Sequence, residues 1–176
     1  MYCLAYESPD KTKRTFFRIQ NPIPHLREDN GLIEVISLHD PSKYVRIFFD
    51  IDHDTNDEDP LNKLLSHLSN LFQCNLNTWA IATCHRESRR SYHIVSTIFC
   101  IQISELRKIA DRLHAIFPCV DTKVLYCAIN DPYECSYFRL PNQTKFRIRK
   151  TAPPIRIETG TLEDFIITDI SKLIKL

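Results

Sequence analysis

The sequence predicts an α+β fold in which a mixed or antiparallel sheet carries helices on one of its faces. Apolar stretches of strand length occur before, between and after two segments with the 3.6-residue periodicity of amphipathic helices. Their order is strands, helix, two strands, helix, two strands and a tail, which differs from the regular alternation of a doubly wound parallel sheet. The 176 residues are 43% hydrophobic and contain no repeats. We therefore expect one domain over residues 1–176 with a substantial core.

The first half of the chain is predicted to hold three strands and one helix. The strands are expected at 15–19, 32–38 and 44–52, and the third is apolar enough to be central in a sheet. Asp59-Pro60 predicts the start of the helix, with the aspartate as N-cap and the proline at the first helical position. The buried face of this helix is predicted by apolar residues at helical spacing: Leu61, Leu64, Leu65, Leu68, Leu71 and Phe72.

The second half is predicted to continue with two strands, a helix, two strands and a helical tail. Pro118 ends the helix because proline cannot continue it. The tail begins with a Thr-x-x-Asp capping pattern. The expected ranges are strands at 78–83 and 91–100, a helix at 104–117, strands at 120–127 and 135–140, and a helix at 161–176.

Composition and charge indicate an ordinary soluble globular protein, with 26% charged residues and a formal net charge of +1. A near-neutral total does not exclude nucleic-acid binding, because docking of a phosphate depends on the local field. The chain has neither a run of about 18 apolar residues nor an N-terminal signal segment. We therefore expect an intracellular, non-secreted protein with no membrane segment, in the cytoplasm or nucleus of a host cell if it is viral.

Cysteine and glycine usage excludes several kinds of site. The seven cysteines are an odd number without a C-x-x-C pair, which is typical of reduced thiols in a cytosolic or nuclear protein. A zinc site of Cys119, Cys127, Cys135 and a histidine is a weaker alternative. The two glycines, Gly31 and Gly160, are too few for a P-loop or a Rossmann turn. Any nucleotide must therefore be bound by side chains and metal.

Asp50 and Asp52 form a D-x-D motif at the end of a predicted buried strand. Residues two apart on a strand point to the same face, so the two carboxylates are expected side by side. Such a pair repels itself unless a proton or a divalent cation lies between the groups, and oxygen ligands suit Mg²⁺ or Mn²⁺. The alternative is a solvated acidic loop. The remaining acids of this stretch are assigned to such a loop or, for Asp59, to the helix cap: Asp54, Asp57, Glu58 and Asp59.

A basic turn precedes Ser91 and His93, which share one face of the strand predicted at 91–100. Arg86, Arg89 and Arg90 lie in this turn, so hydroxyl, imidazole and guanidinium groups are able to converge on one anion. The pattern therefore favours a phosphate site built without glycine. A structural histidine is the alternative for His93.

Three further elements carry charge in or near predicted strands. Asp121 starts one of them, and alone it is an ordinary aspartate at a strand end. Arg139 lies among apolar residues in "YFRLP" and needs an anionic partner, either a protein carboxylate or a ligand phosphate. A basic run follows, and it either forms a solvated face or tracks a nucleic-acid backbone: Lys145, Arg147, Arg149 and Lys150.

Taken in order, these motifs resemble the catalytic signature of the archaeo-eukaryotic primase superfamily, which includes primase-polymerases and the primase modules of large DNA viruses. The matching stretches are "RIFFDID" (46–52), "RRSYHIV" (89–95), "VDTKVLY" (120–126) and "YFRLPNQTK" (137–145). The resemblance covers about 100 residues and includes all three motifs of the superfamily. It implies an RRM-like catalytic sheet, with its motif-bearing core at about 44–150, beside a smaller N-terminal α/β unit.

The resemblance also implies a role for each matched residue. Asp50, Asp52 and Asp121 would hold two divalent ions, Mg²⁺ or Mn²⁺, for nucleotidyl transfer. The triphosphate of the incoming nucleotide would be bound by Arg89, Ser91, His93, Arg139 and Lys145. Single-stranded DNA would be the template, and contacts to nucleic acid are expected from the remaining basic residues: Arg86, Arg90, Arg147, Arg149 and Lys150.

The chain departs from the superfamily in three respects. The stretch "CAINDPYECSY" lacks the basic residue that many primase-polymerases carry before their F-R-L segment, which leaves more of the phosphate binding to Arg139 and Lys145. Neither a clear zinc-binding module nor an ATPase motif is present. Viral relatives often carry a helicase after the primase region, so the chain is also compatible with the N-terminal domain of a primase-helicase, and a helicase domain or subunit is an expected partner.

Three other classes of protein share parts of this pattern. A haloacid-dehalogenase-type phosphatase also begins with D-x-D, but here Asp54 occupies its Thr/Val position and no D-D pair follows. A D-x-D glycosyltransferase needs a longer chain with a separate nucleotide-binding region. A non-catalytic RRM-like module requires aromatic side chains on an open sheet face, for which there are four candidates: Tyr92, Tyr126, Tyr137 and Phe138.

Overall fold

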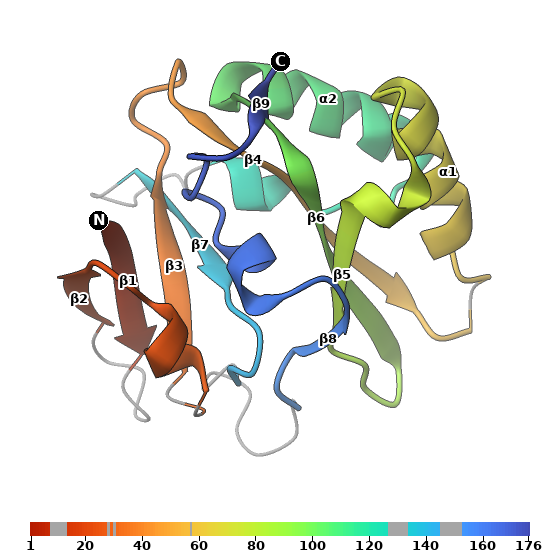
Figure 1. Cartoon of the computed structure of the whole chain (residues 1–176). Helices are drawn as coiled ribbons and strands as arrows, with labels where there is room; N and C mark the ends of the chain where they lie inside the picture. Colours follow the sequence, from red (N-terminus) through yellow and green to blue (C-terminus); the bar gives the residue numbers. More distant parts are fainter. Residues whose placement is uncertain (8–13, 28, 30, 57, 127–133, 145–152) are drawn as a thin grey trace.

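The computed structural model describes the chain except for residues 8–13, 28, 30, 57, 127–133 and 145–152. Within the described part it consists of two sheets and two α-helices, which confirms the α+β class (Figure 1). All strand pairs in these sheets are antiparallel except one short pair at the C-terminus.

The first sheet has four strands in the order β2-β1-β3-β7. Three of them come from the N-terminal part of the chain, and the fourth is contributed by the second half, about a hundred residues later. The strands are β1 (Tyr2–Glu7), β2 (Arg14–Ile19), β3 (Leu32–Ser37) and β7 (Cys135–Arg139). A short 3-10 helix, η1 (Ile23–Leu26), connects β2 to β3.

The second sheet is formed around the long strand β6, with β4 on one side and β5 on the other. β8 extends the sheet beyond β5, and β9 pairs in parallel with the last part of β6. The five strands are β4 (Tyr44–Asp54), β5 (Trp79–Thr83), β6 (Arg89–Gln102), β8 (Arg156–Thr159) and β9 (Ile174–Lys175).

Both α-helices, α1 (Leu61–Leu71) and α2 (Ile103–Ile116), cover one face of the second sheet (Figure 1). The indole Nε1 of Trp79 on β5 donates a hydrogen bond to Ser69 Oγ on α1, at 3.2 Å. The rings of His67 on α1 and Phe117 at the end of α2 lie 5.6 Å apart, so the two helices are neighbours. The helical spacing of apolar residues correctly predicted both helices to within a residue or two.

The other face of the second sheet is turned toward the first sheet. Phe48 on β4 packs edge-on against Phe138 on β7, with ring centroids 5.1 Å apart, and both side chains are buried. The C-terminal segment, residues 160–173, also lies against this face and crosses between the two sheets, where it contacts Arg46 on β4 and Glu34 on β3 (Figure 1). The molecule therefore has three layers: helices, second sheet, and the first sheet together with the C-terminal segment.

Two predicted elements are wrong. Residues 120–126 do not form a strand: Val120 makes one bridge to Ile51, and the chain then enters the 3-10 helix η3 (Thr122–Leu125). The Asp121 carboxylate causes this turn, because its Oδ1 accepts a hydrogen bond from the Lys123 amide. The last residue of that predicted strand, Cys127, lies outside the described part.

The tail is also not an α-helix. The predicted capping box of Thr161 and Asp164 is present, but it starts only one 3-10 turn, η4 (Leu162–Phe165). Phe165, Ile166 and Ile167 follow one another and are all buried, at 0%, 3% and 0% exposure. Three consecutive buried side chains do not fit a helix with one solvated face, so the segment leaves the helical conformation.

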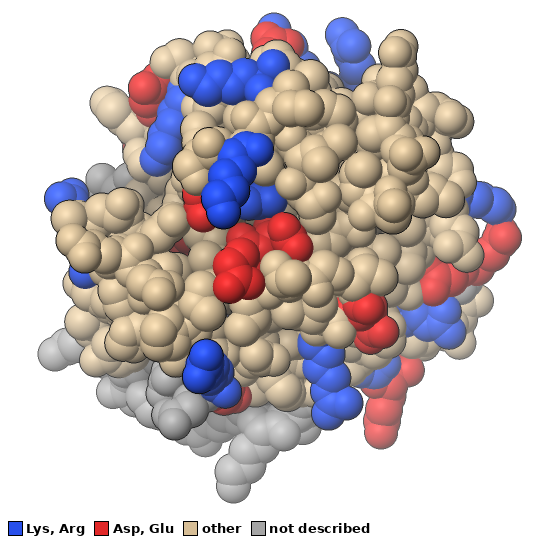
Figure 2. Space-filling view, viewed as in Figure 1, with Lys and Arg blue, Asp and Glu red and all other residues tan. Residues whose placement is uncertain are grey.

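Three strands were not predicted: β1, β8 and β9. The expected N-terminal α/β unit also differs, because the described part of residues 1–43 contains strands and one 3-10 turn but no α-helix. No helix among the described residues has the length and apolar character needed to cross a membrane. On the face seen in Figure 2, basic and acidic side chains are interspersed, as expected for a net charge of +1.

Candidate active site

The D-x-D carboxylates lie within β4 and point to the face that is turned toward the first sheet. The strand continues to Asp54, two residues beyond the predicted end. Asp50 is directly opposite His93 on β6, and Asp52 is directly opposite Ser91. Opposed residues of antiparallel strands project to the same side, so the two motifs predicted from the sequence share one face.

Contacts between these strands connect acidic and basic groups. The Ser91 hydroxyl donates a short hydrogen bond to Asp52 Oδ1, and Arg89 Nη2 lies 3.4 Å from Asp52 Oδ2. His93 Nε2 lies 3.6 Å from Asp50 Oδ1. The side chains of Asp50 and Asp52 remain 23% and 26% exposed, whereas that of His93 is only 6% exposed. The site therefore combines solvent-accessible carboxylates with a rigidly packed imidazole.

Asp121 reaches the same edge of the sheet through backbone pairing with β4. Its amide donates to the Asp50 carbonyl at 2.8 Å, and the Asp52 amide donates to the Cys119 carbonyl at 2.9 Å. These two bonds flank the antiparallel bridge between Ile51 and Val120. Asp121 is consequently the cross-strand neighbour of Asp50, some seventy residues away in sequence.

The first sheet closes the site from the other side. The ring of Phe138 lies 4.5 Å from that of His93, centroid to centroid. Arg139, the last residue of β7, places Nη1 3.6 Å from Cys84 Sγ. Cys84 follows β5, and its amide donates to the Ser91 carbonyl at 3.0 Å. Arg139 is thus next to the Ser91 end of the site, and its partner within the chain is a thiol, whereas the sequence predicted either a protein carboxylate or a ligand phosphate.

The donor set is suitable for a hard divalent cation, because Asp50, Asp52 and Asp121 offer carboxylate oxygens at one sheet edge. Within the described residues, no three Asp, Glu, His or Cys side chains surround a common point that could hold a metal ion. All three carboxylates have partners inside the chain: Asp52 accepts from Ser91, Asp121 Oδ1 accepts from the Lys123 amide at 3.0 Å, and Asp50 Oδ1 lies 3.6 Å from His93 Nε2. The three residues are candidate metal ligands because their backbones are adjacent, and not because of the present positions of their side chains.

The arginines of the basic turn point in different directions. Arg86 and Arg89 close the turn through mutual backbone hydrogen bonds of 2.8 and 3.4 Å. Arg89 extends toward Asp52, whereas Arg90 lies on the opposite face, where Nη1 contacts Asp59 Oδ2 at 3.1 Å. Arg86 Nε is buried and has no hydrogen-bond acceptor among the described residues. Arg86 and Arg89 therefore remain candidates for anion binding, while Arg90 has a protein partner.

Asp59 is the centre of a polar cluster on the helix-facing side of the sheet. Its carboxylate accepts hydrogen bonds from the Tyr92 hydroxyl at 2.5 Å and from the Leu61 amide at 3.0 Å. Burial raises the pKa of Asp59, but these bonds and the charges of His53 and Arg90 outweigh it, so the pKa is lowered. Pro60, not Asp59, occupies the N-cap position, yet the Asp59 side chain still satisfies the first helical amide.

Burial, followed by the hydrogen bond to Asp59, raises the pKa of Tyr92 from 10.0 to about 12. Because the folded-state pKa is raised, the stabilisation by the neutral phenol is complete below pH 10 and is lost as the pH rises toward 12. We expect Tyr92→Phe to flatten the decrease in stability across this interval. Urea denaturation at a series of pH values measures the free energy of unfolding, with Tyr6→Phe as control. If this free energy falls with pH equally in Tyr92→Phe and in the unchanged chain, the loss of stability does not come from Tyr92.

Several predicted residues lie outside the described part of the chain: Cys127, Lys145, Arg147, Arg149 and Lys150. Their proposed roles in zinc, triphosphate and nucleic-acid binding remain predictions. None of the six described cysteines forms a disulfide. Phe138 and Cys84 were not predicted as site residues. Alternation in "YFRLP" places Phe138 on the face opposite to that of Tyr137, but no local pattern indicates which of the two faces is turned toward the site.

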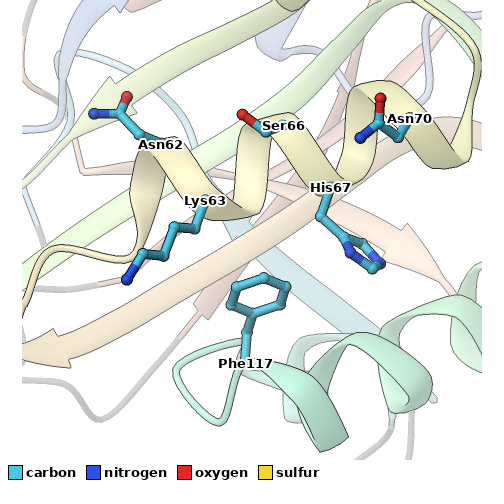
Figure 3. Close-up of a pocket in the computed structure, with 6 residues that line it drawn as sticks. All are labelled: Asn62, Lys63, Ser66, His67, Asn70 and Phe117. Carbon is cyan, nitrogen blue, oxygen red and sulfur yellow. The ribbon is translucent and has the colours of Figure 1, made fainter.

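A separate hollow of about 480 Å³ lies on the helix layer, away from the carboxylates. Figure 3 shows Lys63 and His67 extending from α1 toward Phe117, with three polar residues along the other side of the helix. None of the predicted site residues lines it: the lining consists of Asn62, Lys63, Ser66, His67, Asn70 and Phe117.

In comparisons with known proteins, no family model and no curated sequence matches this chain. The assignment of function consequently depends on the motifs and on the geometry described above.

Proposed function

We propose that this protein is a primase or primase-polymerase of the archaeo-eukaryotic type, which joins nucleotides on a single-stranded DNA template. The observation that carries the proposal is the register of β4 and β6: Asp50 faces His93 and Asp52 faces Ser91, with Asp121 bonded to the backbone of Asp50. The three motifs come from distant parts of the sequence and meet at one sheet edge.

Asp50, Asp52 and Asp121 would hold Mg²⁺ or Mn²⁺, which supplies charge neutralisation and activation of the attacking hydroxyl in nucleotidyl transfer. The chain itself supplies donors for the triphosphate. Ser91 offers a hydroxyl, His93 an imidazole N–H and Arg89 a guanidinium, all on the face that carries the carboxylates. Arg89 is 54% exposed, so it is able to turn from Asp52 toward a phosphate.

His93 is fixed at a position from which it is able to donate a hydrogen bond to a phosphate oxygen. Its ring packs on Phe138 on one side, and its Nε2 is near the Asp50 carboxylate on the other. A donor fixed in advance loses little entropy when it binds, and a donor in a dry environment interacts strongly with anionic oxygen. We assign to His93 the positioning of a triphosphate oxygen beside the carboxylates.

A purely nucleic-acid-binding RRM-like module is less well supported. Such a module requires several aromatic rings on one open face. Tyr92 and Phe138 are buried, on the helix side and between the sheets respectively. Tyr126 bonds to Asp111 beside α2, and Tyr137 contacts Arg14 on the first sheet. The four candidate aromatics therefore do not form one stacking surface on the second sheet.

The decisive experiment is unprimed synthesis on a single-stranded template. The chain is incubated with a synthetic oligodeoxynucleotide, all four nucleoside triphosphates and Mn²⁺ or Mg²⁺, and the products are separated by electrophoresis. The proposal predicts template-dependent dinucleotides and longer products that disappear on chelation. Phosphate release from phosphomonoesters without synthesis would favour the phosphatase alternative, and template binding without synthesis would favour the non-catalytic one.

We expect the double substitution His93→Ala/Arg139→Ala to weaken binding of a nucleoside triphosphate by at least about 100-fold. A hydrogen bond to a charged group contributes about 1.5–3 kcal/mol, and two donors near the site are removed. Equilibrium binding of a fluorescent triphosphate measures the change. Arg112→Ala, on the exposed side of α2, is the matched control. Unchanged affinity in the double variant would reject the assigned triphosphate position.

A further inference from the structure

The first sheet has a second, outward surface that the proposed reaction does not use. Leu4, Ile36 and Phe138 are buried on its inner side. Side chains alternate along a strand, so the residues beside them project outward. We define the outer face by six such residues, which come from all four strands: Cys3, Phe16, Arg18, Val35, Cys135 and Tyr137.

The outer face contains two adjoining depressions, of about 490 and 350 Å³. Four residues line both of them: Cys3, Arg18, Val35 and Cys135. The larger one extends over β2, where Phe16 is 38% exposed. The smaller one extends to Lys43, at the start of β4. An aromatic ring and two cationic side chains thus border one continuous concave surface.

Charge and stacking chemistry distinguish the outer face from an ordinary apolar patch. None of the described residues that line the two depressions is acidic, whereas Arg18 and Lys43 are basic. Next to them, the guanidinium of Arg14 lies 3.9 Å from the ring centroid of Tyr137. Aromatic rings and arginine planes are the groups on which unpaired bases stack, and lysine and arginine pair with the phosphates between them.

We propose that the outer face binds single-stranded nucleic acid. The inference that this strand is the template rests on the proposed function. A single strand is favoured because a duplex hides the faces of its bases, so only an unpaired base can stack on Phe16. A hydrophobic protein partner is disfavoured, since it would bury Arg18 and Lys43 without an opposite charge.

Two elements connect the outer face to the candidate active site. β7 presents Tyr137 outward, while its neighbour Phe138 packs against His93. Lys43 directly precedes β4, which carries Asp50 seven residues later. Seven residues of strand span about 23 Å, which corresponds to about seven nucleotides at the stacked rise of about 3.4 Å per nucleotide. Binding should therefore tighten with length beyond that size.

The test measures fluorescence anisotropy of labelled oligo(dT) of 5 and 20 nucleotides, with chelator present so that the carboxylate site holds no metal. We expect Arg18→Glu/Lys43→Glu to weaken binding of the 20-mer at least tenfold, and to reduce the salt slope of the logarithm of affinity by about 1.4 for two lost phosphate contacts. Phe16→Ala should weaken it about tenfold, whereas Phe16→Tyr, which keeps the ring, should bind normally. Arg112→Glu/Lys172→Glu and Ile116→Ala are exposed controls elsewhere.

The outcomes separate this inference from the proposed activity. Equal losses in the outer-face and control variants, or no oligo(dT) binding by the unchanged chain, would overturn the inference even if primer synthesis is observed. Selective loss in the outer-face variants without any synthesis by the unchanged chain would support the surface and reject the activity. If sedimentation shows that Phe16→Ala disrupts a dimer while DNA affinity stays unchanged, the face is a contact between copies and the inference fails.

Discussion

Replacing Asp50 and Asp52 together by asparagine is expected to reduce dinucleotide synthesis at least about 1000-fold. The change removes two of the three carboxylates that we propose as metal ligands, and losses of this order follow the removal of electrostatic stabilisation from a reaction centre. Asparagine keeps the size of the side chain and one oxygen, so the amide oxygen introduced by Asp52→Asn is still able to accept from Ser91. Product formed per enzyme molecule in the linear phase measures the loss.

The control for this prediction is Asp54→Asn. Asp54 ends the same strand and is exposed, and its Oδ1 accepts a hydrogen bond from the Asn56 amide at 3.0 Å. This variant loses a carboxylate of the same acidic stretch and should keep normal activity. Thermal denaturation of all variants separates loss of chemistry from loss of fold. A double variant that is folded and retains a rate within threefold of the unchanged chain would show that these carboxylates do not hold the metal.

The local part of this site could be predicted because strand geometry has a period of two. Once 44–52 is recognised as a strand, Asp50 and Asp52 must share a face, and the same holds for Ser91 and His93. The register between β4 and β6 determines which face each pair uses and which residues lie opposite one another. A shift of one residue would have placed the two pairs on opposite sides of the sheet. Before the structure, only the family resemblance implied that the two pairs meet in one site.

The errors have a common physical origin. Thr161 and Asp164 are good helix-capping residues, and the local signal for a helix is real. Burial of Phe165 to Ile167 between the sheets contributes more than continued helical hydrogen bonding, so the tertiary contact determines the backbone. In the same way, β7 completes the first sheet by pairing with β3 across about a hundred residues. No local pattern in either strand specifies that partner.

The largest expected effect on stability is that of Arg46→Met, which should reduce the free energy of unfolding by about 3–5 kcal/mol. Arg46 on β4 is 6% exposed and faces the C-terminal segment. Its guanidinium donates to the carbonyls of Ser96 and Asp169, at 3.1 Å each, and to that of Ile166 at 3.3 Å. Methionine fills similar volume but removes all three of these hydrogen bonds, and of the three carbonyls that of Ile166 keeps a donor, the Asp169 amide at 3.2 Å.

The effect is large because a second buried charge holds the same segment from the other sheet. Glu34 on β3 is fully buried and accepts hydrogen bonds from the amides of Ile167 and Thr168, at 2.6 and 2.9 Å. Burial raises the pKa of Glu34, although these bonds and the charge of Arg46 act in the opposite direction. Removing Arg46 therefore also makes the Glu34 carboxylate more costly to bury.

A double-mutant cycle tests whether the two residues act together on the C-terminal segment. If they do, Arg46→Met/Glu34→Gln should destabilise by clearly less than the sum of the single changes, because Glu34→Gln leaves no buried charge that Arg46 must compensate. Urea denaturation measures the four free energies, and Arg112→Met is the exposed control. Strict additivity would mean that the residues hold the segment independently. Since the segment lies between the sheets that carry His93 and Phe138, coupled loss should also lower nucleotide affinity at temperatures where the chain is still folded.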